Sequence, residues 1–189
     1  MTDNRSIAVT GPNGSGKSTL VKIIAGVLSP SSGSVQLELG TTSIPRQQFF
    51  ERLGLVSPYL QLYDEFTAWE NLDFVRKIRG LNAGDDVLNE QLTMVKLFER
   101  RHDIVRTFSS GMKQRLKYAF ALLHRPAVLL LDEPTTNLDE EGVATVNAII
   151  EQQRSRGIVI VATNDPAEAR QCDEILDLRE YQKRKDSSL

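Results

Sequence analysis

The residues with the clearest capacity for chemistry lie in a glycine-rich segment near the start of the chain. Gly11 and Gly16 enclose four residues, and Lys17 and Ser18 follow directly. Glycines let successive backbone N–H groups turn inward toward an anion, and a helix that begins there adds the positive end of its dipole. Lys17 then offers a full charge to the β- and γ-phosphates of a nucleotide, and Ser18 a hydroxyl to Mg²⁺. We predict a phosphate-binding loop rather than a plain turn, since a chance match is on the order of one per cent.

A pair of carboxylates after an apolar run is the second candidate. Residues 127–131 are typical of a strand buried on both faces of a parallel sheet, and Asp132, Glu133 and Pro134 follow. Open α/β sheets bind ligands at the carboxyl ends of their strands. Asp132 could hold Mg²⁺, directly or through a water, and Glu133 could polarise a water aimed at the γ-phosphate. A strand that simply runs into a turn is the alternative, and the phosphate loop upstream favours the functional interpretation.

Strands and helices alternate around these motifs. Apolar or alternating runs predict strands, and apolar residues at helical spacing predict helices. Thr67 and Glu70 form a capping box, Ser109 or Ser110 can cap another helix, and a proline follows the possible cap Asp165. The predicted strands span 6–10, 35–39, 53–56, 127–131, 158–162 and 175–178. The predicted helices span 17–28, 67–79, 85–98, 109–124, 139–153 and a short segment from 165.

This order of elements predicts one α/β domain over residues 1–189. Alternating strands and helices imply a mostly parallel sheet, and a helical stretch interrupts the alternation like an inserted subdomain. We expect a core lobe of about 1–58 and 126–189 and a helical lobe of about 59–125. A chain of 189 residues that is 40% apolar is long enough to bury a sizeable core.

The composition argues against several classes of protein. The chain has 23 Lys and Arg against 25 Asp and Glu, so it lacks the basic excess of a dedicated nucleic-acid binder. The single cysteine, Cys172, leaves no internal disulfide framework and fits a reducing cytosol. The longest apolar run, 118–123, is far shorter than the ~20 residues of a membrane span. Polar residues at 2–6 make a signal peptide unexpected, and the charged tail from Arg179 is expected to be solvated.

The segment 108–115, Phe-Ser-Ser-Gly-Met-Lys-Gln-Arg, resembles the signature motif of ABC-type ATPases. Asp132 follows Gln114 by 18 residues, in the family's order of signature, helix and acidic strand. The segment 136–139 looks like the family's D-loop. The resemblance covers about 6–178 and is closest to the short ATP-binding subunits of small transporters, including the haem-exporter type.

The resemblance implies a P-loop NTPase core of the RecA-like type that binds ATP and Mg²⁺ and hydrolyses ATP. Two subunits, identical or different, would pair head to tail, each ATP lying between the phosphate loop of one and the signature of the other. It implies Glu133 and Lys17 as catalytic residues, and Ser18 and Asp132 as metal ligands. The residues that it places around the nucleotide are Gly11, Pro12, Asn13, Gly14, Ser15, Gly16, Lys17, Ser18, Thr19, Ser109, Ser110, Gly111, Met112 and Asp139.

The resemblance also implies a membrane-spanning transporter subunit as a partner. The chain would then be cytoplasmic and peripheral on the inner face of the cell membrane, and no nucleic acid is expected. Motion driven by ATP would pass to the membrane subunit through about 57–80. Tyr63, Phe66 and Trp69 are candidate contact residues there, and packing of the helical lobe is the alternative role for them.

One departure from the family concerns its switch histidine. Asn164 stands at that position, after the predicted strand 158–162. An amide can donate a hydrogen bond to the γ-phosphate, but it cannot become cationic. Neither His102 nor His124 is expected to substitute, since both lie in or beside the helical lobe. We therefore expect slow hydrolysis, with Asn164 in the catalytic set.

Two further departures concern the join between the lobes and the start of the chain. Pro58 stands where the family has a glutamine, and Gln61 is the candidate to reach into the site instead. Only ten residues precede Gly11, so the family's N-terminal antiparallel strands and adenine-stacking aromatic are expected to be reduced or missing.

Alternatives to a transport ATPase stay open at this point. A degenerate or truncated ABC-type module would bind ATP with little turnover; Asn164 and Pro58 favour it, and intact Lys17, Asp132 and Glu133 argue against it. A soluble ABC ATPase acting on DNA or ribosomes is disfavoured by the near-neutral charge. A small-molecule kinase would need an acceptor site and has no use for the Ser-Ser-Gly segment.

Overall fold

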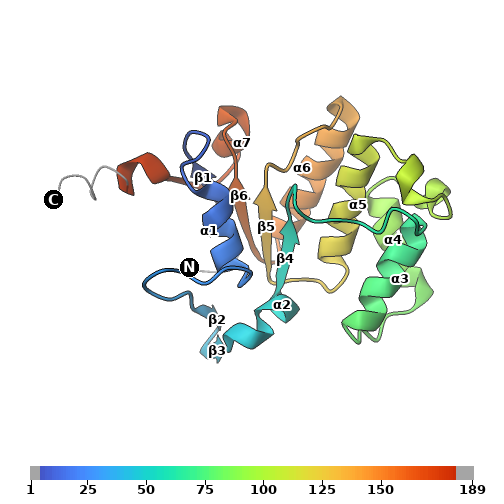
Figure 1. Cartoon of the computed structure of the whole chain (residues 1–189), viewed down its shortest axis with the longest axis horizontal. Coiled ribbons are helices and arrows are strands. Elements are labelled where there is room, and N and C mark those ends of the chain that lie inside the picture. The colour runs from blue at the N-terminus through green and yellow to red at the C-terminus, as the bar shows by residue number, and fades with distance from the viewer. Residues whose placement is uncertain (1–4, 182–189) are drawn as a thin grey trace.

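A parallel sheet of five strands forms the centre of the computed structural model, which describes residues 5–181 (Figure 1). The strand order is β4–β5–β6–β1–β7, and every neighbouring pair is parallel. The carboxyl ends of the strands therefore meet at one edge. The bounds are Ser6–Thr10 for β1, Leu53–Val56 for β4, Val128–Asp132 for β5, Ile158–Ala162 for β6 and Glu174–Asp177 for β7.

Helices cover both faces of this sheet. Successive strand residues point to opposite faces, and the apolar side chains on each face are buried by helices. On β5, Leu129 and Leu131 pack with the helical segments, whereas Val128 and Leu130 pack with Val21 of α1. The predicted α/β class with a mostly parallel sheet is confirmed. The bounds are Lys17–Ile24 for α1, Phe49–Arg52 for α2, Ala68–Ile78 for α3, Asp85–Met94 for α4, Ser110–Leu122 for α5, Glu140–Arg154 for α6 and Pro166–Arg170 for α7.

Two helices end earlier than their apolar spacing predicts. The prediction of 17–28 is too long because Gly26, at φ 77°, adopts a left-handed conformation after α1. The prediction of 85–98 is too long because Lys96, at φ 55°, breaks α4 from the short 3₁₀ turn Phe98–Arg100. In both cases the apolar residues beyond the break continue the sequence pattern but not the backbone conformation.

The antiparallel part of the fold is small. Strand β2 (Leu37–Leu39) pairs with β3 (Thr42–Ile44) across a turn in which Gly40 has φ 60°. The predicted strand 35–39 is thus shorter than expected, and β3 was not predicted. Between residue 5 and the glycine-rich loop, β1 is the strand that the structure describes, and it is parallel to both of its neighbours.

The predicted helix starts are confirmed at two caps. The Thr67 hydroxyl accepts from the Glu70 N–H at 3.1 Å, and the Glu70 carboxylate accepts from the Thr67 N–H at 2.8 Å. Asp165 caps α7, with Pro166 at its first position. No helix within 5–181 is long and apolar enough to cross a membrane. The predictions for residues 2–4 and for the tail beyond 181 lie outside the described residues.

Candidate functional site

The glycine-rich loop joins β1 to α1 at the carboxyl edge of the sheet. Gly11, Gly14 and Gly16 have φ values of 146°, 80° and 99°, which a residue with a side chain rarely adopts. The Lys17 ammonium is buried and donates to the carbonyls of Gly11 at 2.8 Å and Pro12 at 3.1 Å. The lysine side chain thus connects the end of the loop to its start. This places the ammonium charge inside the loop, as we expect of a loop that binds phosphate.

Ser18 and Asp132 meet beside this loop. The Ser18 hydroxyl donates to Oδ1 of the buried Asp132 carboxylate at 2.9 Å. Burial raises the pKa of the Asp132 carboxyl; the hydrogen bond from Ser18 opposes this shift, and the charge of Glu133 adds to it. A cation at this position would offset the cost of burying the carboxylate.

The donor set at Ser18 and Asp132 fits Mg²⁺. This ion is usually held by one or two protein oxygens together with phosphates and waters. No group of three or more His, Cys, Asp or Glu residues gathers as a metal cluster within 5–181. The oxygens of Ser18 and Asp132 fit a site of two side chains that a nucleotide would complete.

Glu133 follows β5 in an uncommon backbone conformation. Its φ is 53°, in the left-handed region, and its N–H donates to the Ala162 carbonyl at the end of β6 at 2.9 Å. Its half-buried carboxylate accepts from the Thr136 hydroxyl at 3.5 Å. Such conformations persist where the surroundings hold them, and they are frequent at functional sites.

Asn164 lies across from the glycine-rich loop. Its side-chain amide donates to Oδ1 of Asn13 at 3.3 Å, and both side chains are exposed. The preceding residue, Thr163, is tied to β1 by an N–H that donates to the Val9 carbonyl at 3.1 Å. The structure thus brings the predicted residues of the loop, β5 and β6 to one edge of the sheet.

Neither histidine lies at this edge. His102 is exposed, and Nε2 of His124 lies 3.0 Å from the carbonyl of Leu53, the first residue of β4. Burial lowers the pKa of His124 to about 4, the charge of Arg79 acts in the same direction, and the contact with Leu53 opposes both. His124 therefore joins the end of the α5 segment to the opposite end of the sheet.

The Ser-Ser-Gly segment lies at the exposed tip of α5. The Ser109 hydroxyl caps the helix by accepting from the Met112 N–H at 3.2 Å. A Cβ on Gly111 would lie 3.1 Å from the Asn137 carbonyl, so this tip packs against the segment after β5. In that segment, Asp139 caps α6 by accepting from the Gly142 N–H at 2.8 Å. The contacts of this tip are thus with its own helix and the segment before α6, away from the glycine-rich loop.

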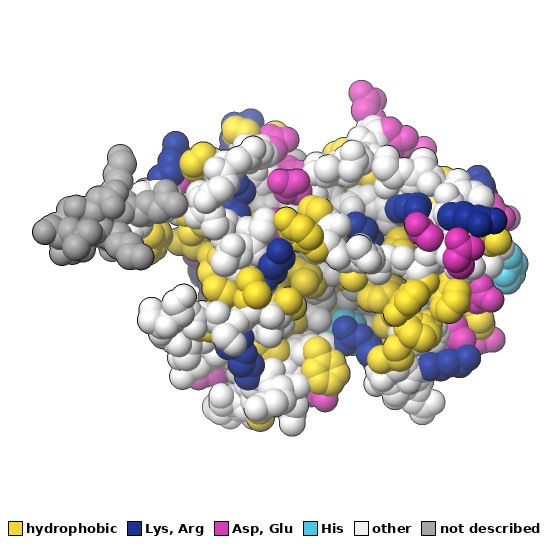
Figure 2. Space-filling model, in the orientation of Figure 1, with side chains coloured by type: hydrophobic (Ala, Val, Ile, Leu, Met, Phe, Trp, Pro, Cys, Tyr) yellow, Lys and Arg dark blue, Asp and Glu magenta, His cyan; other side chains and the backbone are white. Residues whose placement is uncertain are grey.

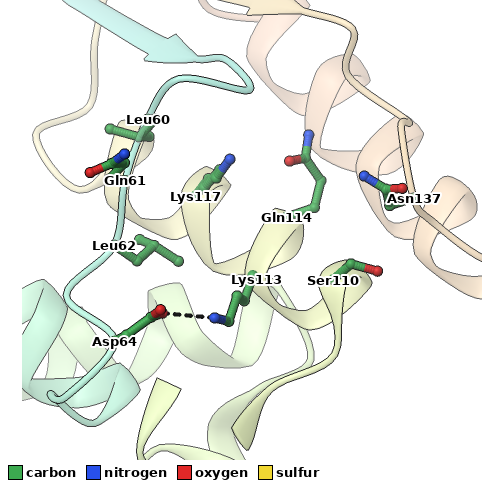
Figure 3. A pocket seen from close by; sticks show the side chains of 9 residues that line it. All are labelled: Leu60, Gln61, Leu62, Asp64, Ser110, Lys113, Gln114, Lys117 and Asn137. Carbon is green, nitrogen blue, oxygen red and sulfur yellow. Dashed lines mark hydrogen bonds and ion pairs between the residues drawn. The ribbon is translucent and has the colours of Figure 1, made fainter. Parts of the chain in front are cut away.

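A cleft of about 450 Å³ separates the segment after β4 from α5 (Figure 3). Gln61 is exposed and lies on one side, and Gln114 and Asn137 lie on the other. The Lys117 ammonium donates to the Ser57 carbonyl at 3.2 Å, and burial lowers the pKa of Lys117. The lining residues are Leu60, Gln61, Leu62, Asp64, Ser110, Lys113, Gln114, Lys117 and Asn137, so Gln61 shares this cleft with the α5 tip rather than with the glycine-rich loop.

Sequence reasoning missed two buried donors on α5. Gln114 Nε2 donates to the Pro134 carbonyl at 3.1 Å, and the Tyr118 hydroxyl donates to the same oxygen at 3.0 Å. Tyr118 was counted only as part of an apolar run. Its spacing of four residues from Gln114 places both polar groups on one helix face, and this was the signal available in the sequence.

The three candidate contact aromatics divide into two environments. Tyr63 and Phe66 are partly exposed and pack with Phe74, at ring centroid distances of 4.7 Å for Tyr63–Phe74 and 6.0 Å for Phe66–Phe74. Figure 2 shows hydrophobic side chains gathered on the surface over α3. Trp69 instead packs against the core of the helical segments. Packing within the helical segments thus holds for all three residues, and Tyr63 and Phe66 also keep exposed surface.

The comparisons with known proteins agree with this geometry. Residues 1–136 match a family model described as ABC transporter. The chain is 36% identical over 177 residues to the uncharacterized ABC transporter ATP-binding protein YxlF of Bacillus subtilis, covering 92% of this chain and 58% of YxlF. It is 29% identical over 175 residues to the cytochrome c biogenesis ATP-binding export protein CcmA of Mannheimia succiniciproducens, covering 93% and 81% of the two chains.

A solved structure is also similar. It is the dimeric ATP-binding cassette MJ0796 in a post-hydrolysis state, bound to ADP and Pi, with a TM-score of 0.80 at 25% identity. The match covers 94% of this chain and 82% of that one. The chain therefore spans most of the solved cassette, but little more than half the length of YxlF.

Proposed function

Since this chain belongs to the ABC transporter family, as one of its ATP-binding proteins, we propose that it binds and hydrolyses ATP to power transport across a membrane. The observation that carries the proposal is the convergence of the glycine-rich loop with the ends of β5 and β6. There the Lys17 ammonium donates to the Gly11 carbonyl, and the Ser18 hydroxyl donates to Asp132. Glu133 and Asn164 follow the two neighbouring strands.

Each residue at this edge has a role in the proposal. Lys17 and the loop N–H groups bind the β- and γ-phosphates. Ser18 and Asp132 hold Mg²⁺, which stabilises negative charge on the phosphates when bound. Glu133 orients and deprotonates the attacking water, and Asn164 donates a hydrogen bond toward the γ-phosphate.

The site is completed in this proposal by a second subunit. Ser109, Ser110 and the Gly111 N–H lie at a helix N-terminus, which favours an anion. Ser110 lines a cleft whose lining includes no residue of the glycine-rich loop. In this proposal these groups therefore reach a nucleotide only across a head-to-tail dimer, with Met112 and Asp139 beside them. The dimeric state of the similar cassette MJ0796 supports this arrangement.

The wider assembly follows from the same proposal. We assign residues 1–58 and 126–189 to a core lobe, and 59–125 to a helical lobe that carries the signature. A membrane-spanning subunit is the further partner, and Tyr63 and Phe66 are the exposed aromatics that suit its contact. The chain would then act on the cytoplasmic side, peripheral to the membrane.

A steady-state assay of phosphate release with ATP and Mg²⁺ tests the catalytic proposal. The Glu133→Gln variant keeps the shape of the site but removes the base, so its turnover should fall roughly 10²–10⁴-fold. Nucleotide binding should persist in this variant. Wild-type protein that releases phosphate no faster than Glu133→Gln contradicts the assignment of hydrolysis.

That contrary result would favour a second candidate function, an ATP-dependent clamp with little turnover. Two observations favour it. The uncharged Asn164 occupies the position of the family's switch histidine, and Gln61 lies in the cleft beside α5 rather than at the phosphate loop. The two functions share nucleotide binding and dimerisation, so the rate of phosphate release is what separates them.

A further inference from the structure

The turn after β5 is held by two α5 side chains, one within the segment 108–115 that resembles the signature motif and one beyond it. Gln114 and Tyr118 lie one turn apart on α5 and both donate to the carbonyl of Pro134, at 3.1 Å and 3.0 Å. Gln114 is 7% exposed and Tyr118 is fully buried. Pro134 has no N–H, so this carbonyl is the group through which its backbone can be held by hydrogen bonds.

We propose that Gln114 and Tyr118 are positioning residues that hold the Glu133 carboxylate in place through the Pro134 carbonyl. This inference rests on the proposed hydrolysis of ATP. Pro134 follows Glu133 directly, and Glu133 has the left-handed φ of 53° that only its surroundings can maintain. Two donors on one oxygen fix the orientation of the Pro134–Thr135 peptide unit, which lies one residue beyond Glu133.

The opposite side of the same turn is anchored as well. The Thr135 hydroxyl donates to the carboxylate of Glu168 on α7, and the Glu133 N–H donates to the Ala162 carbonyl. The turn is therefore held between α5 on one side and β6 with α7 on the other. Loss of the α5 bonds leaves the turn attached but free to shift, and a shift on the order of 1 Å at a catalytic group can cost up to ~10²-fold in rate.

A matched bond exists at the other end of β5. Gln153 of α6 is 1% exposed, and its Nε2 donates to the Pro126 carbonyl at 2.9 Å. This is the same chemical contact, a buried glutamine amide on a proline carbonyl, but at the edge of the sheet away from Glu133. The Gln153→Leu variant therefore reports the stability cost of losing such a bond without a change at the catalytic turn.

The experiment compares kcat and KM for ATP among Gln114→Leu, Tyr118→Phe and Gln153→Leu, with thermal unfolding of each. We expect kcat to fall about tenfold in the first two, with KM nearly unchanged, and to stay at the wild-type value in Gln153→Leu despite a similar loss of Tm. Tyr118→Phe removes one oxygen atom, so it keeps the test open if Gln114→Leu does not fold. In a Glu133→Gln background, Tyr118→Phe should cause no further loss of turnover.

Other results overturn the inference. Wild-type kcat in Tyr118→Phe, an equal fall in Gln153→Leu, or a further tenfold loss on top of Glu133→Gln would each show that these side chains do not act through the glutamate. In all three cases a wild-type protein that hydrolyses ATP leaves the proposed function standing. A wild-type protein that does not exceed Glu133→Gln overturns the proposed function and this inference together.

Discussion

The phosphate loop and the tip of α5 are held in different ways. The loop is bonded to itself through Lys17, to the end of β5 through Ser18, and to Asn164, which follows β6, through Asn13. The α5 tip has exposed serines, and the hydrogen bond of Ser109 lies within its own helix. One region is a set of side chains assembled within the chain, and the other is an exposed helix end.

This difference explains why one chain is an incomplete enzyme in our account. Binding of phosphates and metal needs groups that converge, and the core provides them at one sheet edge. The α5 tip lies beside a different cleft, so it contributes only when a second copy presents it. Variants in the glycine-rich loop should therefore weaken nucleotide binding even in a single copy. Variants in the α5 tip should change dimerisation and turnover but not nucleotide binding by one copy.

The largest expected effect on ATP binding is that of Lys17→Ala. The change removes the buried charge and the closure of the loop, so ATP affinity and turnover should each fall roughly 10²–10³-fold. A nucleotide titration by calorimetry measures this effect. Lys77→Ala, which changes an exposed lysine on α3, is the control and should bind as the wild type does. Equal affinity of Lys17→Ala and wild type would remove the loop from the site.

The next effect concerns the contact between His124, after the end of α5, and Leu53 on β4. The pKa of His124 is about 4 in the folded chain, against about 6.5 when unfolded, so the unfolded chain takes up the proton first as the pH falls. The contribution of His124 to the free energy of unfolding is therefore fully present above pH 6.5, and it is lost progressively as the pH falls toward 4. Between pH 7 and pH 5 we expect His124 to account for a loss of ~2 kcal/mol in the free energy of unfolding.

Denaturant unfolding of variants isolates this contribution. His124→Gln should lose most of the difference between pH 7 and pH 5, since its side chain does not titrate. His102→Gln changes an exposed histidine and should keep the difference. Identical pH dependence in the wild type and His124→Gln would exclude His124 as its cause.

A smaller effect is expected from Asn164→His. A cationic donor toward the γ-phosphate makes a hydrogen bond about 1 kcal/mol stronger than a neutral amide does, so turnover should rise about fivefold. Asn164→Gln keeps an amide without the charge and serves as the control. The prediction of slow hydrolysis fails if phosphate release by Asn164→His equals that of the wild type.

The smallest effect is expected from Gln61→Ala. Its amide lies on the wall of the cleft shared with the α5 tip, so it contributes to turnover only when the pair closes. Loss of one ordinary hydrogen bond predicts a fall of about threefold. Gln152→Ala, at an exposed glutamine on α6, is the matched control. Equal turnover in both variants would remove Gln61 from the site.

The sequence predicts the phosphate site better than the rest of the molecule. Residues 11–18 are contiguous, so their motif is local, and the ends of parallel strands must share an edge. The convergence of Ser18, Asp132 and Asn164 therefore follows from the strand order. Strand β4 and the caps at Thr67 and Asp165 were predictable for the same reason, because a few adjacent residues determine them.

Other features depend on contacts that are distant in the chain. The bond from Tyr118 to Pro134 and the contact between His124 and Leu53 join residues 16 and 71 positions apart. No local pattern specifies such partners. The place of Gln61 is similarly undetermined, because the segment after β4 has no periodicity to fix its course. Helix α4 ends before Lys96, which has a left-handed φ of 55°. A lysine rarely adopts this conformation, so its residue type does not predict the helix end.

The most direct test is the molar mass of Glu133→Gln in solution, measured by light scattering with and without ATP and Mg²⁺. Our account predicts a monomer without nucleotide and twice that mass with it, because bound ATP joins the loop of one copy to the α5 tip of the other. Adding Ser110→Arg, at an exposed position on that tip, should return the ATP-bound protein to a monomer. A protein that binds ATP yet stays monomeric, or that doubles in mass regardless of Ser110→Arg, would contradict the claim that the nucleotide is shared between two copies.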